Sequence, residues 1–498
     1  MSWYLTLPLA VPFATAVLAF LFRESGAGRW IPVLGSALGV AASALLFEKV
    51  LTDGVLVGQM GDWPAPFGIT LAADLLSAVM VLLTAVAGLA VTIYSLGEVG
   101  PELQRLGYHA VGQVLLGGVT GAFLTGDLFN LYVWYEVMLI ASFGLLILGG
   151  RRAQIDGAVR YVTLNLVSTA MFLSGIGLLY GVTGTLNMAD LRGAVDASPQ
   201  QGLLTVIAMF FLIAFGMKAA AFPLFSWLPA SYHTPAYGVS AIFAGLLSKV
   251  GVYSLYRTFT LIFDNDIGYT HQILFWLAGL TMITGVLGAL AQTEIRRILS
   301  FQIISSIGFL LLGLGIYTPA AVAGAVFYLI HNIPVKVTLF LAAGTADRLT
   351  GSAETPKMGG LYRTAPFLSV LFMIPALSLA GFPPLSGFWA KVLLVKASLD
   401  AQAFVMAGVA LAVGLLTLWS MATLWAEAFW KAHPEDRFPT LEDLGSTQVT
   451  SIVPIAGLAL VTLAIGLFPG PVIALADGIA AQLLDPAAYV AAVLGGTP

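Results

Sequence analysis

The chain has 498 residues, of which 59% are apolar and only 9% carry a formal charge, against roughly 25% charged residues in soluble domains. This composition excludes a cytosolic globular protein, and the formal net charge of −4 leaves no basic footprint for nucleic acid. The sequence contains no cysteine, which excludes disulfides, iron–sulfur clusters and thiolate zinc sites. The five histidines are scattered singly, and we expect neither a metal site nor a cofactor-binding site.

Apolar runs of membrane length follow one another along the whole chain. A spanning helix needs about 20 predominantly apolar residues. The first ten residues contain no lysine or arginine, so the first run predicts a retained transmembrane helix and not a signal peptide. The runs predict an all-α integral membrane protein with about fourteen spans, at residues 2–22, 30–47, 71–95, 108–125, 128–149, 159–182, 203–228, 237–257, 271–291, 298–316, 320–344, 366–396, 404–426 and 450–469.

A last apolar segment, at residues 471–496, is interrupted by Asp477, Asp485 and Pro486. We expect it to lie along the surface of the bundle, with a fifteenth span as the alternative.

Lysine and arginine are concentrated in alternate loops. Those after the odd-numbered spans hold thirteen basic residues, namely Arg23, Arg29, Arg105, Arg151, Arg152, Arg160, Arg296, Arg297, Arg348, Lys357, Arg363, Lys431 and Arg437. The remaining loops hold four, namely Lys49, Arg192, Arg257 and Lys396. Because basic loops stay in the cytoplasm, this bias predicts cytoplasmic odd-numbered loops and both termini outside.

The loops thus account for 17 of the 21 basic residues, and the remaining four lie inside apolar runs. One glutamate and one histidine also lie in mid-span. The full set is Glu136, Lys218, Lys249, His331, Lys336 and Lys391. Each position is more than one turn from a predicted helix end, so snorkelling to the interface does not explain them.

A charge at the bilayer centre costs roughly 2.5–3.5 kcal/mol on insertion scales, so each of these residues needs a partner, water or a neutral state. Burial favours the neutral form of a lysine, and a nearby carboxylate favours the charged form. A carboxylate that moves relative to two lysines would therefore pass protons along. The alternatives are packed ion pairs that lock helices together and, for His331, a hydrogen bond to a carbonyl.

Three further titratable residues lie nearer to span ends or in a loop. Asp74 and Glu427 fit helix-end structure and an access path equally well, and His233 is either solvated or a site of proton uptake.

Two spans carry proline next to a buried lysine in matching patterns, at Pro223 and at Pro383 and Pro384, and Pro334 near Lys336 adds a third disturbance outside this match. Proline breaks or kinks a helix, and freed backbone at membrane depth is tolerated where it lines a wet cavity or is buried in protein. The two breaks share the pattern F-P-L-F-S-W and F-P-P-L-S-G-F-W and lie five spans apart. An odd separation inverts topology, as in transporters built from inverted repeats.

This pattern predicts four parts. They are N-terminal spans 1–3 at residues 1–107, two inverted five-helix repeats at 108–257 and 271–426, and the last span with the surface tail at 427–498.

Several motifs resemble the antiporter-like subunits shared by respiratory complex I, membrane-bound hydrogenases and Mrp-type cation/proton antiporters. They are DLFNLYVWYEV (127–137), KAAAFPLFSWLP (218–229), the stretch 248–251, FYLIHNIPVK (327–336) and LAGFPPLSGFWAK (379–391). Within this superfamily the chain looks most like the D-type family of Mrp antiporter subunits, on the segments 61–80, 425–434 and 482–495.

The resemblance implies a role for each buried charge. Glu136 and Lys218 would form a switchable ion pair, and Lys249 would connect it to the rest. His331 and Lys336 would continue the polar axis to Lys391, the terminal proton carrier. The loop WLPASYHTPAYG (227–238) departs from the commoner pattern around its histidine, which puts proton uptake through that histidine in doubt.

The resemblance also implies a hetero-oligomeric partner complex in a bacterial-type cell membrane, exchanging cytoplasmic Na⁺ for external H⁺. The chain would be a non-catalytic component of this transporter. No cluster of intramembrane carboxylates suggests a sodium cage, since hard cations favour oxygen ligands, so we expect sodium to be handled elsewhere in the complex or at a shared interface. The alternatives are a proton-pumping subunit of a redox-driven complex and, in a different class, a structural membrane anchor with inert ion pairs.

Overall fold

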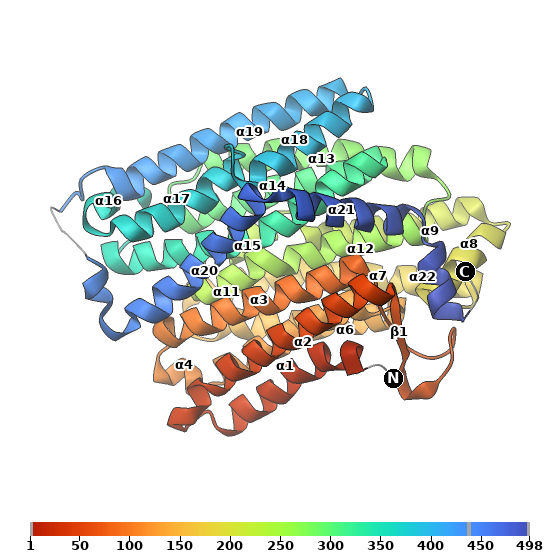
Figure 1. Ribbon diagram of the computed structural model, residues 1–498, viewed down its shortest axis with the longest axis horizontal. Helices are drawn as coiled ribbons and strands as arrows, with labels where there is room; N and C mark the ends of the chain where they lie inside the picture. The colour runs from red at the N-terminus through yellow and green to blue at the C-terminus, as the bar shows by residue number, and fades with distance from the viewer. Residues whose placement is uncertain (1–2, 436–439, 496–498) are drawn as a thin grey trace.

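A computed structural model describes residues 3–435 and 440–495 of the chain. The helices run side by side along the long axis of the molecule, with the N-terminal helices along one edge and α19 along the opposite edge (Figure 1). The start of α1 and the end of α22 lie at the same end of the bundle.

The first part of the chain contains two short strands among its helices. These elements are α1 (Trp3–Leu21), η1 (Gly26–Arg29), α2 (Ile31–Asp53), β1 (Leu56–Gln59), η2 (Met60–Asp62), β2 (Thr70–Ala73), α3 (Leu75–Glu98), α4 (Pro101–Arg105), α5 (Tyr108–Leu124), α6 (Leu128–Ile147), α7 (Arg152–Thr183) and α8 (Met188–Ala197). The strands form an antiparallel pair with Leu56 opposite Ala73.

The middle part of the chain carries the first helix break. Its elements are α9 (Gln201–Ala219), α10 (Trp227–Ser231), α11 (Tyr237–Ile242), the π-helical turn η3 (Phe243–Leu247), α12 (Ser248–Leu261), α13 (Ile267–Leu290), α14 (Ile295–Ile316) and α15 (Pro319–Thr350).

The last part of the chain carries the second break. Its elements are η4 (Thr355–Lys357), α16 (Leu361–Thr364), α17 (Pro366–Ala380), α18 (Ser386–Asp400), α19 (Phe404–Trp425), the π-helical turn η5 (Ala426–Trp430), η6 (Leu441–Thr447), α20 (Gln448–Leu467), α21 (Pro469–Leu484) and α22 (Ala487–Leu494).

The predicted all-α membrane architecture is confirmed. In the described residues, 12 helical segments are long and apolar enough to cross a membrane, or 13 if the bent pair of α21 and α22 counts as one. The shorter helix α5 packs between α1 and α6, and α17 with α18 forms one interrupted segment. Adding these two to the 12 gives the roughly fourteen spans expected from length and hydropathy.

Several boundaries differ from the sequence prediction. The run at 71–95 begins with strand β2, and the helix starts only after Asp74, whose side chain caps α3 by accepting from the N–H of Ser77 at 2.9 Å. Pro334 lies inside α15 without ending it. The loop assignment of Arg257 is wrong, because it lies in α12 and is buried. Arg437 lies outside the described residues.

The two proline-containing breaks follow helices that end in the left-handed region. α9 ends before Ala220, at φ 64°, and α17 ends before Gly381, at φ 91°. Glycine adopts this conformation without strain, whereas alanine does so at a cost of about 1–2 kcal/mol. Pro223 lies in the irregular stretch before α10, and Pro383 and Pro384 lie in the one before α18. Each break leaves terminal carbonyl groups without an intrahelical donor.

The centre of the bundle is formed by the segment from α11 to α12 with α14 and α15. The span at Tyr237–Leu261 is completely buried within the chain, and so are residues 321–346 of the span at Pro319–Thr350. The C-terminal helix α21 packs on α15 and α12 through the buried face containing Ala476, Ile479 and Ala480. The segment expected to lie on the surface therefore covers the central helices with one face, and α22 turns away from it by 67°.

Candidate functional site

Lys218 lies at the end of α9, one residue before the first break. Its side chain is buried, and its Nζ donates a hydrogen bond to Oδ1 of Asn165 on α7 at 3.0 Å. The ring centroid of Tyr135 lies 5.4 Å from the same nitrogen. Helix α12 approaches this helix end closely, because a Cβ at Gly251 would lie only 2.5 Å from the backbone nitrogen of Ala219. The first break therefore holds Lys218 between α7 and α12.

Glu136 lies on α6 beside Tyr135 and is half-buried. Its charge acts on Lys218, but the lysine is hydrogen-bonded to the amide of Asn165 and not to the carboxylate. The structure thus brings Glu136 and Lys218 into the same region, but the lysine is bonded to a third residue, Asn165. Sequence reasoning missed Asn165, although an amide inside the apolar run at 159–182 is a signal that could have found it.

Lys249 lies directly after the π-helical turn η3, in the middle of the segment from α11 to α12. The side chain is fully buried, and its Nζ donates to the carbonyl oxygen of Ala244, inside that turn, at 2.6 Å. Single π-helical turns within α-helices are rare and occur frequently at functional sites. Nothing in the sequence predicted this turn, since it contains only apolar residues and glycine.

Lys336 and His331 lie on α15, which packs against η3, α14 and α18. The Nζ of Lys336 donates to the carbonyl oxygen of Gln302 on α14 at 2.9 Å. The charges of Lys249, Lys336 and Lys391 all act on His331. The structure therefore gathers these four residues around the central helices.

At the second break, His331 contacts a pair of serines and Lys391 bonds to a backbone carbonyl. The Nδ1 of His331 lies 3.2 Å from Oγ of Ser386, which lies 2.8 Å from Oγ of Ser378 across the break. The Nζ of Lys391 donates to the carbonyl oxygen of Ala380, the last residue of α17, at 2.8 Å. This carbonyl is one that the helix end leaves without an intrahelical donor. Sequence reasoning missed both serines.

Polar atoms without a hydrogen-bond partner gather on the same central helices. Among the described residues, these buried atoms include Oγ of Ser248, Nε2 of Gln302, Oγ of Ser305, Nε2 of His331 and both amide atoms of Asn332. Most buried polar groups in proteins are satisfied by protein or by ordered water. The cluster therefore marks α12, α14 and α15 as the polar interior of the bundle.

Outside the row of mid-span charges, which consists of Glu136, Lys218, Lys249, Lys336, His331 and Lys391, Asp74 forms a closed ion pair with Arg257. The shortest contact joins Oδ2 of Asp74 to Nη1 of Arg257 at 2.7 Å, and both side chains are buried. The arginine also lies over the rings of Tyr253 and Tyr489, the latter on α22. This geometry fits the helix-end interpretation of Asp74.

Glu427 and His233 also lie apart from the row. Glu427 pairs with Lys431 at 2.5 Å in the turn that ends α19. His233 lies in the loop after α10, where burial and the positive charge of Arg297 lower its pKa to about 4. Its ring is therefore neutral near pH 7, with Nδ1 bonded to the carbonyl of Pro229 at 2.8 Å.

The four lysines and His331 of the row can hold or release a proton, and each is bonded to an oxygen that belongs to a neutral group. Lys218 uses an amide, Lys249 and Lys391 use carbonyls at disturbed helix segments, and His331 uses a hydroxyl. Such an arrangement can carry protons because no lysine in it is fixed by a carboxylate.

Similar proteins place this fold in a family. Residues 125–417 match the family of NADH:quinone oxidoreductase/Mrp antiporter transmembrane subunits. The D-type Na⁺/H⁺ antiporter subunit of Alkalihalophilus pseudofirmus is 43% identical over 489 residues, covering 98% of both chains. A chain of the Mrp complex from Dietzia sp. DQ12-45-1b has a TM-score of 0.91 and 32% identity, covering 99% of this chain and 100% of that one.

A chain of an archaeal membrane-bound sulfane sulfur reductase superimposes equally well, with a TM-score of 0.92, 25% identity, and the same coverage of 99% and 100%. The fold is thus common to antiporter and respiratory complexes, while sequence identity is higher to the antiporter proteins. The chain is a multi-pass membrane protein. It belongs to the NADH:quinone oxidoreductase/Mrp antiporter transmembrane family, as the motifs in the sequence indicated.

Proposed function

We propose that this chain is a proton-translocating subunit of a multisubunit Na⁺/H⁺ antiporter. The observation that carries the proposal is the row of buried lysines bonded to neutral oxygens along the central helices. Protons move along the row formed by Glu136, Lys218, Lys249, Lys336, His331 and Lys391.

The first break acts as the switch of this relay. Lys218 lies in the last turn of α9 beside an irregular stretch, so its side chain can exchange the amide of Asn165 for the carboxylate of Glu136. A nearby carboxylate stabilises the charged form of a lysine. A neutral oxygen in an apolar interior stabilises that form less. Movement of Lys218 between these partners changes how firmly Lys249, the next lysine, keeps its proton.

The second break carries the proton to Lys391. The Nε2 of His331 has no hydrogen-bond partner among the described residues, and its Nδ1 is hydrogen-bonded to Oγ of Ser386. Lys391 is half-buried and lines an apolar groove of about 720 Å³ between α18 and α19. This position suits a terminal carrier that passes its proton out of the chain.

The proposed complex lies in a bacterial-type cell membrane, with the loop that contains Arg151 and the start of α14 at Arg296 on the cytoplasmic side and both termini outside. The chain divides into two inverted repeats at 108–257 and 271–426, which place one break in each half. Sodium is handled by other subunits or at their interface, because the intramembrane charges of this chain are mainly basic, and sodium requires oxygen ligands.

A redox-driven proton pump is the second candidate, favoured by the equal superposition on the sulfane sulfur reductase chain. The relay would work in the same way in such a complex. The higher identity to the D-type antiporter proteins supports the antiporter.

The test compares two lysines of one helix. Lys391→Ala removes a member of the row, and Lys396→Ala removes an exposed lysine five residues further along α18, paired with Asp400. Na⁺-dependent pH change is measured in vesicles that contain the whole complex. We expect the first variant, together with Lys218→Ala and Glu136→Ala, to lose transport in a normally assembled complex. Unchanged transport in these three variants would refute the relay and favour a structural anchor.

A further inference from the structure

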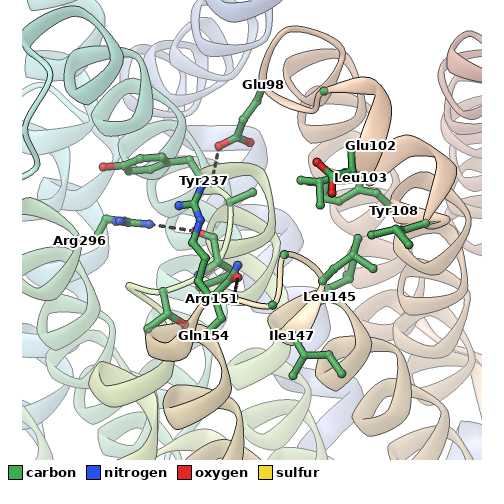
Figure 2. A pocket seen from close by; sticks show the side chains of 18 of the residues that line it. Glu98, Glu102, Leu103, Tyr108, Leu145, Ile147, Arg151, Gln154, Tyr237 and Arg296 are labelled. Atoms are coloured by element: carbon green, nitrogen blue, oxygen red, sulfur yellow. Dashed lines mark hydrogen bonds between the residues drawn. The ribbon is translucent and has the colours of Figure 1, made fainter.

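A charged pocket opens at one end of the bundle, away from every residue of the relay. It has a volume of about 830 Å³ and is bordered by the end of α3, α4, the loop between α6 and α7, the loop before α11 and the ends of α14 and α15. Its charged lining consists of Glu98, Glu102, Arg151, Arg296 and Asp347. Figure 2 shows Glu98, Glu102, Arg151 and Arg296 around this space, with Glu98 bonded to Tyr237.

Glu98 is the last residue of α3, and its carboxylate reaches across to the start of α11. The oxygens accept hydrogen bonds from the backbone N–H groups of Tyr237 at 2.5 Å and Gly238 at 2.9 Å. The first N–H groups of a helix have no partner inside it. A side chain from α3 therefore supplies the N-terminal cap of α11.

The charged groups around Glu98 come from several helices. Arg296 of α14 lies 4.4 Å from the ring of Tyr237 and donates to the carbonyl of Pro235 at 2.9 Å, while the hydroxyl of Tyr237 donates to Asp347 of α15 at 2.7 Å. Arg348 of α15 acts on Glu98 through its charge.

Tyrosines complete these surroundings on the side of α3 and α5. Tyr94 lies on α3 itself, and Tyr108 of α5 lies 3.1 Å from Oγ of Ser95. The hydrogen bonds of Glu98 in the described residues come from backbone N–H groups, and the basic side chains around it bond elsewhere or act at longer range. A half-buried carboxylate of this kind, open to a pocket large enough to hold water and held by neutral donors, can exchange its proton with water in the pocket.

The helix that Glu98 caps leads directly to the relay. Lys249 lies twelve residues after Tyr237, about 18 Å along the helix axis at 1.5 Å per residue, and the π-helical turn η3 lies between them. In a protonated carboxyl group the oxygen that carries the proton becomes a donor and a poorer acceptor, so the group holds the two N–H groups less firmly. The start of α11 is then held less firmly, and η3, whose carbonyl of Ala244 holds Lys249, is the segment able to absorb the shift.

We propose that this pocket is the port through which the chain exchanges protons with one aqueous side. Glu98 is the group that takes up and releases the proton, and the segment from α11 to η3 couples its protonation to Lys249. The step transfers a proton from water in the pocket to a carboxylate and back. This inference rests on the proposed relay function.

The test uses the whole complex in vesicles and measures Na⁺-dependent proton exchange between about pH 6 and pH 9. Glu98→Gln removes the titration, and Glu98→Asp keeps it with a shortened side chain. Glu102→Gln is the matched control, because it removes an exposed carboxylate from the same pocket. We expect Glu98→Gln to lower exchange at least about tenfold with a flattened pH profile, Glu98→Asp to displace the profile, and the control to behave as the wild type.

A wild-type pH profile in assembled Glu98→Asp or Glu98→Gln complex would overturn the port. A uniform fall with an unchanged profile would also overturn it, because a purely structural cap alters the amount of active complex and not its titration. Lys249→Met separates the two proposals. Loss of transport in Lys249→Met with normal titration in the Glu98 variants refutes the port alone, and unchanged transport in Lys249→Met refutes the relay.

Discussion

Replacing Gly251 by alanine tests whether transport depends on the close approach of α12 to the end of α9. The added Cβ would lie 2.5 Å from the backbone nitrogen of Ala219 and 2.9 Å from the carbonyl carbon of Lys218. Ordinary contact begins at 3.4 Å, so the two helices must separate by about 0.9 Å. The obstructing atoms belong to backbone and cannot rotate away.

The effect on stability should be small. Inserting a methyl group into a packed interior costs about 1–3 kcal/mol, and replacing glycine by alanine within a helix returns about 1 kcal/mol. The effect on transport should be larger, because the shift falls on Lys218. A displacement of about 0.9 Å could lengthen its bond to Asn165 from 3.0 Å to about 3.9 Å, outside hydrogen-bonding range.

We therefore expect Gly251→Ala to assemble normally and to lower Na⁺-dependent proton exchange at least about tenfold, since misplacement by 1 Å can reduce a reaction rate about 100-fold. The assay is pH change in vesicles, divided by the amount of assembled complex on a native gel. Gly177→Ala is the control, because a Cβ at this position of α7 meets nothing within 4 Å. Wild-type exchange in assembled Gly251→Ala complex would refute the reasoning.

Three further predictions concern other parts of the chain. Gly387→Ala should abolish exchange in the vesicle assay, because its Cβ would lie 1.8 Å from the carbonyl oxygen of Ser378 across the second break; normal exchange would contradict this packing. Asp74→Asn should destabilise the complex by about 3–5 kcal/mol, since it leaves Arg257 buried and unpaired, and Asp74→Asn with Arg257→Met should melt at a higher temperature than Asp74→Asn alone. The folded-state pKa of His233, about 4, lies below its ordinary value of 6.5, so the stability that His233 contributes is present above pH 6.5 and is lost as the pH falls toward 4. Melting curves should therefore show that His233→Asn loses less stability than the wild type between pH 6.5 and pH 4. Equal losses would contradict a neutral imidazole in the folded state.

The architecture and the buried charges could be predicted from the sequence because both are local signals. A lysine in an apolar run is visible without knowledge of its neighbours, and a proline in a span predicts a break at its own position. Pro223 lies in such a break, whereas Pro334 lies within α15, which continues past it. Whether a helix breaks or continues at a proline depends on the neighbouring helices that pack against it. The sequence of the span itself carries no information about these neighbours.

The partners of the charges could not be predicted, because they come from distant elements. Asn165 lies 53 residues before Lys218, and Ser386 lies 55 residues after His331. Arg257 was assigned to a loop because the apolar run before it ends there, whereas its partner Asp74, 183 residues away, allows α12 to continue to Leu261. Glu98 could have been noticed as an acidic residue at the end of a span, but its role as a cap depends on α11.

The contrast between Arg257 and the lysines favours a relay over an inert anchor. An ion pair that only locks helices needs a fixed carboxylate, and Asp74 provides one for Arg257 at 2.7 Å. The buried lysines have neutral oxygens in the same position, including the carbonyls of Ala244 and Ala380. A neutral oxygen compensates only part of a charge that costs roughly 2.5–3.5 kcal/mol at the bilayer centre. The same chain thus builds a closed ion pair at one helix end and leaves its central lysines without one, which is the arrangement that a moving proton requires.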